Sequence, residues 1–141
     1  KLGLFGKSKD DKKLIDDLLT WMEKNKADYS NTFCYLMNIK IGNNNLYNDR
    51  DFINWSNEWQ NRISINDNSK EKSFELMKKT NPIIIPRNHK VEEALKAANE
   101  DNLEVMNKLL SKFDNPYSEQ KGIEDYQLPS LDDNYKTFCG T

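Results

Sequence analysis

The order of apolar and polar positions predicts helices over most of the chain. In residues 10–25 apolar side chains recur every three or four positions, and charged side chains fill the opposite face. This apolar face consists of Leu14, Ile15, Leu18, Leu19 and Met22. A second, shorter helix is predicted over residues 29–37, and the glycine and asparagines of residues 42–45 then interrupt the pattern as a loop.

The next helix has an aromatic face. Four large apolar residues follow one another at steps of three, four and four: Phe52, Trp55, Trp59 and Ile63. Residues 66–69 are turn formers, and they predict the start of a further helix that runs from about residue 70 to residue 79. Phe74 and Met77 are the expected buried residues of that helix.

Two prolines separate this part of the chain from the next. Pro82 and Pro86 lack the backbone donor that a helix interior requires, so residues 81–88 are predicted as an extended, partly buried connector. Asn88 is the expected cap of the helix that follows. The residues of that helix predicted to face inward are Val91, Ala94, Leu95 and Ala98.

Asp101 and Glu104 suggest a capping arrangement at the start of one more helix. Its expected core residues are Leu103, Met106, Leu109, Leu110 and Phe113. No periodic pattern continues after Pro116, and no segment alternates with a period of two. We therefore predict an all-α fold, a compact bundle of about five to six helices. Residues 1–113 are its helical region, and residues 114–141 are an extended acidic tail.

Composition narrows the classes of function. The chain has 141 residues, 21 basic and 23 acidic, and the charges are intermixed, so nucleic-acid binding is not expected. No apolar run approaches the roughly 20 residues of a membrane span. A signal-peptide pattern is absent as well, so a cytoplasmic protein is expected. The first residue is Lys rather than Met, which suggests a piece of a longer protein.

Few residues offer reactive chemistry. The single histidine, His89, excludes a two-histidine metal site, and with the two cysteines it cannot complete a zinc site. We predict no catalytic, cofactor-binding or metal-binding residue in this chain. Cys139 stands out, because a thiol near a chain end is accessible for redox chemistry. Cys34 is expected to be an inert core thiol, and a bridge between the two cysteines is the alternative.

The amino-acid sequence resembles the C-terminal part of proteins of the selenoprotein O (SelO) family. The segment NPIIIPRNHK at residues 81–90 and the terminal YKTFCGT carry the resemblance. KLGL at residues 1–4, DYSNTF at residues 28–33 and the tryptophan-rich DFINWSNEWQNRI are similar to earlier landmarks. Members of the family end with a cysteine or selenocysteine at the third position from the terminus, which is the position of Cys139.

The resemblance implies a parent protein with a kinase-like (pseudokinase) fold that binds ATP with Mg or Mn and transfers AMP to Ser, Thr or Tyr of protein substrates. The ATP site and the metal ligands would lie upstream, so this fragment is expected to be inactive alone and to bind no cofactor. Its partner would be the remaining kinase-like core, where an upstream cysteine would pair with Cys139 as a redox switch. The alternative is a stand-alone helical protein-interaction module that presents its helical hairpin or its tail.

Overall fold

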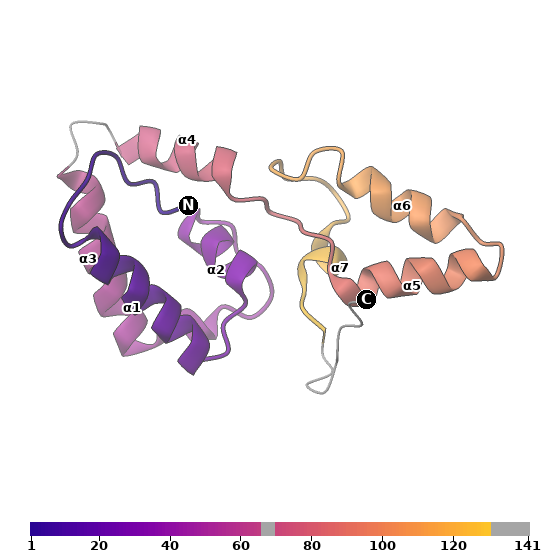
Figure 1. The fold of residues 1–141 in the computed structure, drawn as a ribbon, viewed down its shortest axis with the longest axis horizontal. Coiled ribbons are helices and arrows are strands. Elements are labelled where there is room, and N and C mark those ends of the chain that lie inside the picture. The colour runs from indigo at the N-terminus through magenta and orange to yellow at the C-terminus, as the bar shows by residue number, and fades with distance from the viewer. Residues whose placement is uncertain (66–69, 131–141) are drawn as a thin grey trace. The chain divides into compact units, whose positions relative to one another are not determined.

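The computed structural model describes residues 1–65 and 70–130 and contains helices but no β-strand within these ranges, as Figure 1 shows. The predicted all-α class is therefore confirmed. The chain divides into two compact units, Lys1–Asn81 and Pro82–Thr141. The predicted division into a helical region, 1–113, and a tail, 114–141, rests on a different criterion and stays a prediction. No helix in the described ranges is both long and apolar enough to cross a membrane.

The first unit contains four α-helices and one 3-10 helix, η1, within its described residues. Their bounds are α1 Asp11–Lys24, α2 Tyr29–Leu36, η1 Asn45–Asn48, α3 Arg50–Ser64 and α4 Lys70–Thr80. Two aspartates fix helix starts: Asp28 accepts a hydrogen bond from the Asn31 amide, and Asp49 accepts from the Asp51 and Phe52 amides. The helices therefore begin and end close to where the sequence predicts them.

The aromatic face of α3 forms the core of the first unit, where α1 packs against α3. Phe52, Trp55, Trp59 and Ile63 are all buried, as the spacing predicts. The rings of Trp55 and Trp59 stack with centroids 5.9 Å apart. The indole of Trp55 donates to the Leu14 carbonyl at 2.8 Å, so α3 is joined to α1 by a buried polar contact as well as by packing.

Within residues 82–130, the second unit contains a helical hairpin and a short third helix. Its elements are α5 Asn88–Asn99, α6 Glu104–Lys112 and α7 Glu124–Gln127. The helices α5 and α6 pack against each other, as Figure 1 shows. The sequence predicts no regular structure after Pro116, so the four-residue α7 is an addition to the predicted set of helices.

Residues 82–87 form the predicted partly buried connector, and two hydrogen bonds to Gln127 hold it in place. Ile83 and Ile84 are buried in it. The Gln127 side chain donates to the Ile83 carbonyl at 2.8 Å, and Arg87 Nη2 donates to the Gln127 carbonyl at 2.7 Å. Because of these bonds, the buried residue Gln127 belongs to the core of the second unit although it lies beyond Pro116.

Two predicted caps are wrong. The N-cap of α5 is Arg87, and Asn88 is already the first helical residue. Asp101 does not start α6: its φ is 61°, and it ends α5 in the left-handed conformation. The amides of Asp101 and Asn102 donate to the carbonyls of Ala98 and Ala97, the hydrogen bonds of a helix C-terminus.

Candidate functional site

The residue singled out for function, Cys139, lies outside the described residues. Its predicted redox role therefore stays a prediction, and so does the alternative bridge to Cys34. Cys34 lies on α2 with 0% of its surface exposed, in agreement with the expected core position. Burial in apolar surroundings disfavours the thiolate, which is the reactive form of cysteine.

The other two candidate groups, a histidine and a cysteine, belong to different units of the chain. His89 lies in the first turn of α5, in the second unit, whereas Cys34 is in the first unit. Burial, followed by the charges of Lys90 and Arg87, lowers the pKa of His89 below its usual 6.5, so its imidazole is neutral at pH 7. Within residues 1–65 and 70–130, no three His, Cys, Asp or Glu side chains lie close enough to hold a metal ion.

A set of long-range polar contacts in the first unit surrounds its first six residues, which we call the N-terminal strap. Three of its backbone carbonyls accept hydrogen bonds from side chains far along the chain. The Trp59 indole donates to Leu2 at 2.9 Å, Arg62 Nη2 donates to Phe5 at 3.1 Å, and Asn81 Nδ2 donates to Lys1 at 2.8 Å. The strap is thus bound to α3 and to the residue that follows α4.

Gly3 brings the strap into close contact with α4. Its φ is +69°, a left-handed conformation that side chains other than glycine rarely adopt. A Cβ atom at Gly3 would lie 2.7 Å from the Ser73 carbonyl oxygen and 3.1 Å from Met77 Cγ. Gly6 has a similar φ of +67° but no neighbour within 4 Å. The absence of a side chain is therefore required for packing at Gly3, but not at Gly6.

An ion pair fixes the end of the strap. Arg62 Nε and Nη2 donate to the Asp11 carboxylate at 2.6 and 3.1 Å, and the Ser8 amide donates to the same carboxylate at 2.9 Å. Both side chains are mostly shielded from solvent, with 14% of Arg62 and 19% of Asp11 exposed. The hydrogen bonds from Arg62 are the main reason that the pKa of Asp11 lies below its usual 3.8.

We expect Asp11→Asn to lower the free energy of unfolding at pH 7 by about 1–3 kcal/mol, because it removes charge-assisted hydrogen bonds. A depressed carboxyl pKa stabilises the fold above the unfolded-state value of 3.8. This stabilisation disappears as the pH falls from about 4 through the folded-state pKa. Urea titrations at pH 7 and pH 3 should therefore show a smaller difference between wild type and Asp11→Asn at pH 3.

The control for this prediction is Lys24→Gln. Lys24 pairs with Asp51 at 3.2 Å, but both side chains are more than half exposed. Water screens such a pair, so its loss should change stability little at either pH. Equal effects of Asp11→Asn at pH 7 and pH 3 would contradict the role assigned to the ion pair.

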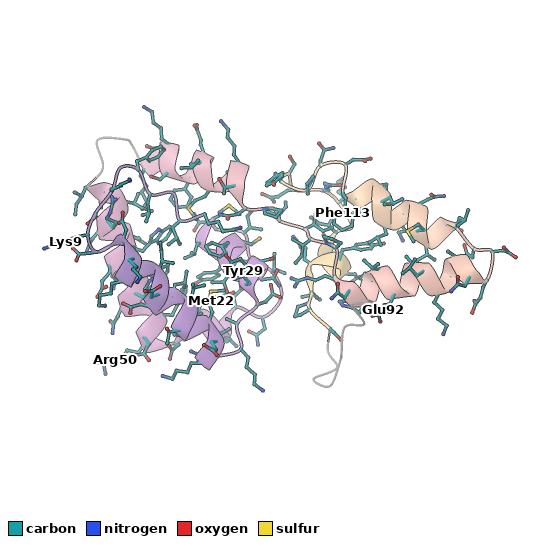
Figure 2. All side chains as sticks on the ribbon, in the orientation of Figure 1. Lys9, Met22, Tyr29, Arg50, Glu92 and Phe113 are labelled. Carbon is teal, nitrogen blue, oxygen red and sulfur yellow. The ribbon has the colours of Figure 1, made fainter. Side chains whose placement is uncertain are left out.

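A groove of about 250 Å³ lies beside the strap. Its walls come from the strap, α1, α2 and α4, and its lining includes Leu4, Ile15, Leu19, Tyr29, Phe33 and Leu76. Ile15, Leu19 and Tyr29 are 41%, 43% and 48% exposed. Figure 2 shows the side chain of Tyr29 at the first residue of α2. The Lys1 ammonium also lines the groove and lies 5.6 Å from the Tyr29 ring centroid and 5.2 Å from that of Phe33.

A second pocket of the first unit, about 470 Å³, lies between α2, α3 and α4. Tyr35, Trp59 and Phe74 supply aromatic surface, and Lys40, Lys70 and Glu71 supply charge. Since both signs of charge are present, the pocket has no evident preference for anions or cations.

The described part of the chain therefore has helices as its only regular secondary structure, and an N-terminal strap is bound to the helices of its first unit. The family described as protein adenylyltransferase SelO matches residues 1–114, and the chain belongs to this family. It is 48% identical over 143 residues to the protein nucleotidyltransferase YdiU of Pelagibacter ubique and 47% identical over 144 residues to that of Bacillus cereus strain G9842. Each match covers 100% of this chain, which spans about 30% of the length of these relatives. The resemblance noted from the sequence is thereby confirmed.

Sequence analysis missed the strap and the groove. The sequence marks KLGL at residues 1–4 as similar to a family landmark, and that similarity does not indicate how the segment packs. Two glycines within six residues, followed by polar and charged residues, are a usable signal of a non-helical segment with special backbone angles. The partners of that segment lie on α3 and after α4, where no local pattern could indicate them.

Proposed function

We propose that this chain is the C-terminal portion of a protein adenylyltransferase of the SelO type. The observation that carries the proposal is the family match over residues 1–114, together with relatives that are nearly half identical over the whole chain and much longer than it. The parent would transfer AMP from ATP, with Mg or Mn, to hydroxyl groups of protein substrates in the cytoplasm. This portion would supply structural support and a redox-sensitive terminus, whereas the ATP site would lie elsewhere in the parent.

The test is AMP transfer. Full-length parent incubated with labelled ATP and Mg or Mn should label protein substrates, whereas the 141-residue chain should not. Transfer by the isolated chain would contradict the assignment of the ATP site to the rest of the parent. A parent that transfers no AMP under any of these conditions would contradict the proposed activity.

The redox role rests on Cys139, and a pair of variants tests it. In the parent, Cys139→Ser should remove the response of AMP transfer to reductant and oxidant, because no terminal disulfide can then form. Cys34→Ala, the matched control, should keep that response, since Cys34 is buried. If both variants lose the response, the bridge between Cys34 and Cys139 explains it instead. If neither loses it, the redox role is wrong.

A helical interaction module is the second candidate. Three leucines of the second unit favour it, because Leu95, Leu103 and Leu110 are 51%, 59% and 57% exposed and lie on or beside the α5–α6 hairpin. Exposed apolar residues that gather on one element often mark a protein-binding surface. The genomic reading frame separates the candidates: a frame that starts at or near Lys1 favours the module, and a longer one favours the parent enzyme.

A further inference from the structure

The groove beside the N-terminal strap is an apolar surface that the first unit leaves open. Ile15 and Leu19 are one turn apart on α1, and Tyr29 begins α2. All three are more than 40% exposed although they line a concave surface. Removing apolar side chains from water is favourable roughly in proportion to the area buried, so a complementary segment would gain from covering them.

The groove has a mainly apolar lining. Among the described residues that line it, Lys1 has the one charged side chain, and its Nζ contacts the Asn81 side-chain oxygen at 3.3 Å and two aromatic rings. These contacts are all with neutral groups. Lys1 is itself an exposed residue, so its cation can stay in water, and the apolar remainder of the lining best suits an apolar segment.

Two observations identify the occupant. The curated relatives match this chain over about 30% of their own length, so most of such a protein lies outside it. Lys1 itself lines the groove, so any chain that precedes Lys1 begins at the edge of this surface. We propose that an apolar segment of the remaining parent chain packs into the groove lined by Ile15, Leu19 and Tyr29. This inference rests on the proposed function, since it requires the longer parent.

Photo-cross-linking in the full-length parent tests the proposal. Leu19→p-benzoylphenylalanine places a reactive group in the groove, and Thr20→p-benzoylphenylalanine places it on an exposed neighbouring position of α1 that does not line the groove. We expect irradiation to yield, for position 19 but not for position 20, adducts with parent peptides outside these 141 residues, identified by mass spectrometry. Tyr29→p-benzoylphenylalanine replaces one aromatic residue by another and serves if the Leu19 variant does not fold.

Three results would overturn the inference. Adducts found solely within these 141 residues would mean that the chain covers its own groove. A cross-linked dimer that disappears on dilution would assign the groove to a second copy. Equal yields from positions 19 and 20 would mean that the groove is uncovered. Each result is independent of AMP transfer, so a parent that gives the expected adducts but no transfer would contradict the proposed function alone.

A matched pair of charge substitutions gives a second readout. Leu19→Glu should lower the thermal midpoint of the full-length parent more than Thr20→Glu, because it buries a carboxylate against the docked segment. Equal midpoints would contradict the docking of a segment at Leu19.

Discussion

Gly3→Ala should destabilise the first unit by about 2–4 kcal/mol, because it combines left-handed backbone strain with a steric clash. The alanine Cβ would lie 2.7 Å from the Ser73 carbonyl oxygen. That oxygen belongs to the backbone of α4, so it cannot move aside as the end of a flexible side chain can. Urea denaturation followed by far-UV circular dichroism measures the effect.

Gly6→Ala is the matched control. The two glycines have nearly the same φ, +69° at Gly3 and +67° at Gly6, but a Cβ at Gly6 would have no neighbour within 4 Å. Its expected cost is therefore the backbone strain alone, about 1–2 kcal/mol. If the two variants are equally destabilised, the strap does not pack closely against α4.

Trp59→Ala should lower the free energy of unfolding by about 3–5 kcal/mol, the range observed for removing a large aromatic side chain from a core. Trp59 is 3% exposed, stacks on Trp55 and holds the strap through the Leu2 carbonyl. The substitution thus removes packing and also leaves that carbonyl without its indole donor. Chemical denaturation monitored by circular dichroism measures the loss, since tryptophan fluorescence itself changes in the variant.

Two further variants separate the contributions. Trp59→Phe keeps most of the ring volume but cannot donate to Leu2, so its expected cost is about 1–3 kcal/mol. Ile53→Ala, on the same helix, removes a side chain that is 46% exposed and should have a small effect. A cost of Trp59→Phe close to zero would show that the hydrogen bond to the strap contributes little.

The helices of the first unit could be predicted well from the sequence, because the residues with the strongest apolar periodicity are also the residues that form the core. Steps of three, four and four place the aromatic residues from Phe52 to Ile63 on one face, and that face is buried. The same pattern overestimates burial elsewhere. Ile15 and Leu19 extend the apolar face of α1 beyond its buried residues Leu14 and Leu18. Periodicity indicates which side of a helix is apolar, but not how much of that side has a neighbour.

The second unit shows the same limit more clearly. Leu95, Leu103 and Leu110 have helical spacing and were predicted to face the core, yet each is more than half exposed. A hairpin of two helices buries one narrow strip of each, here around Ala94 and Leu109. The predicted role of Asp101 at the start of α6 was wrong for a different reason. Aspartate is found both at helix starts and in the left-handed conformation at helix ends, and the composition of the segment does not distinguish the two.

The polar contacts of the strap could not be predicted at all. Arg62 and Trp59 donate to backbone carbonyls 57 residues earlier in the chain. Every residue has a backbone carbonyl, so the sequence does not indicate which one accepts a distant hydrogen bond. Cys139 is the opposite case: the sequence marks it clearly, but its predicted role depends on a cysteine outside this chain.

The hydrogen bond between Asn81 and Lys1 brings the two ends of the first unit together. Its buried side chain donates to the Lys1 carbonyl at 2.8 Å, so the first and last residues of this unit are hydrogen-bonded neighbours. Units whose ends lie together are the ones that tolerate insertion into another protein and circular permutation. The first unit therefore has the end-to-end geometry that circular permutation requires. Joining Asn81 to Lys1 through a short linker and opening the chain at the Gly42 loop should preserve its core.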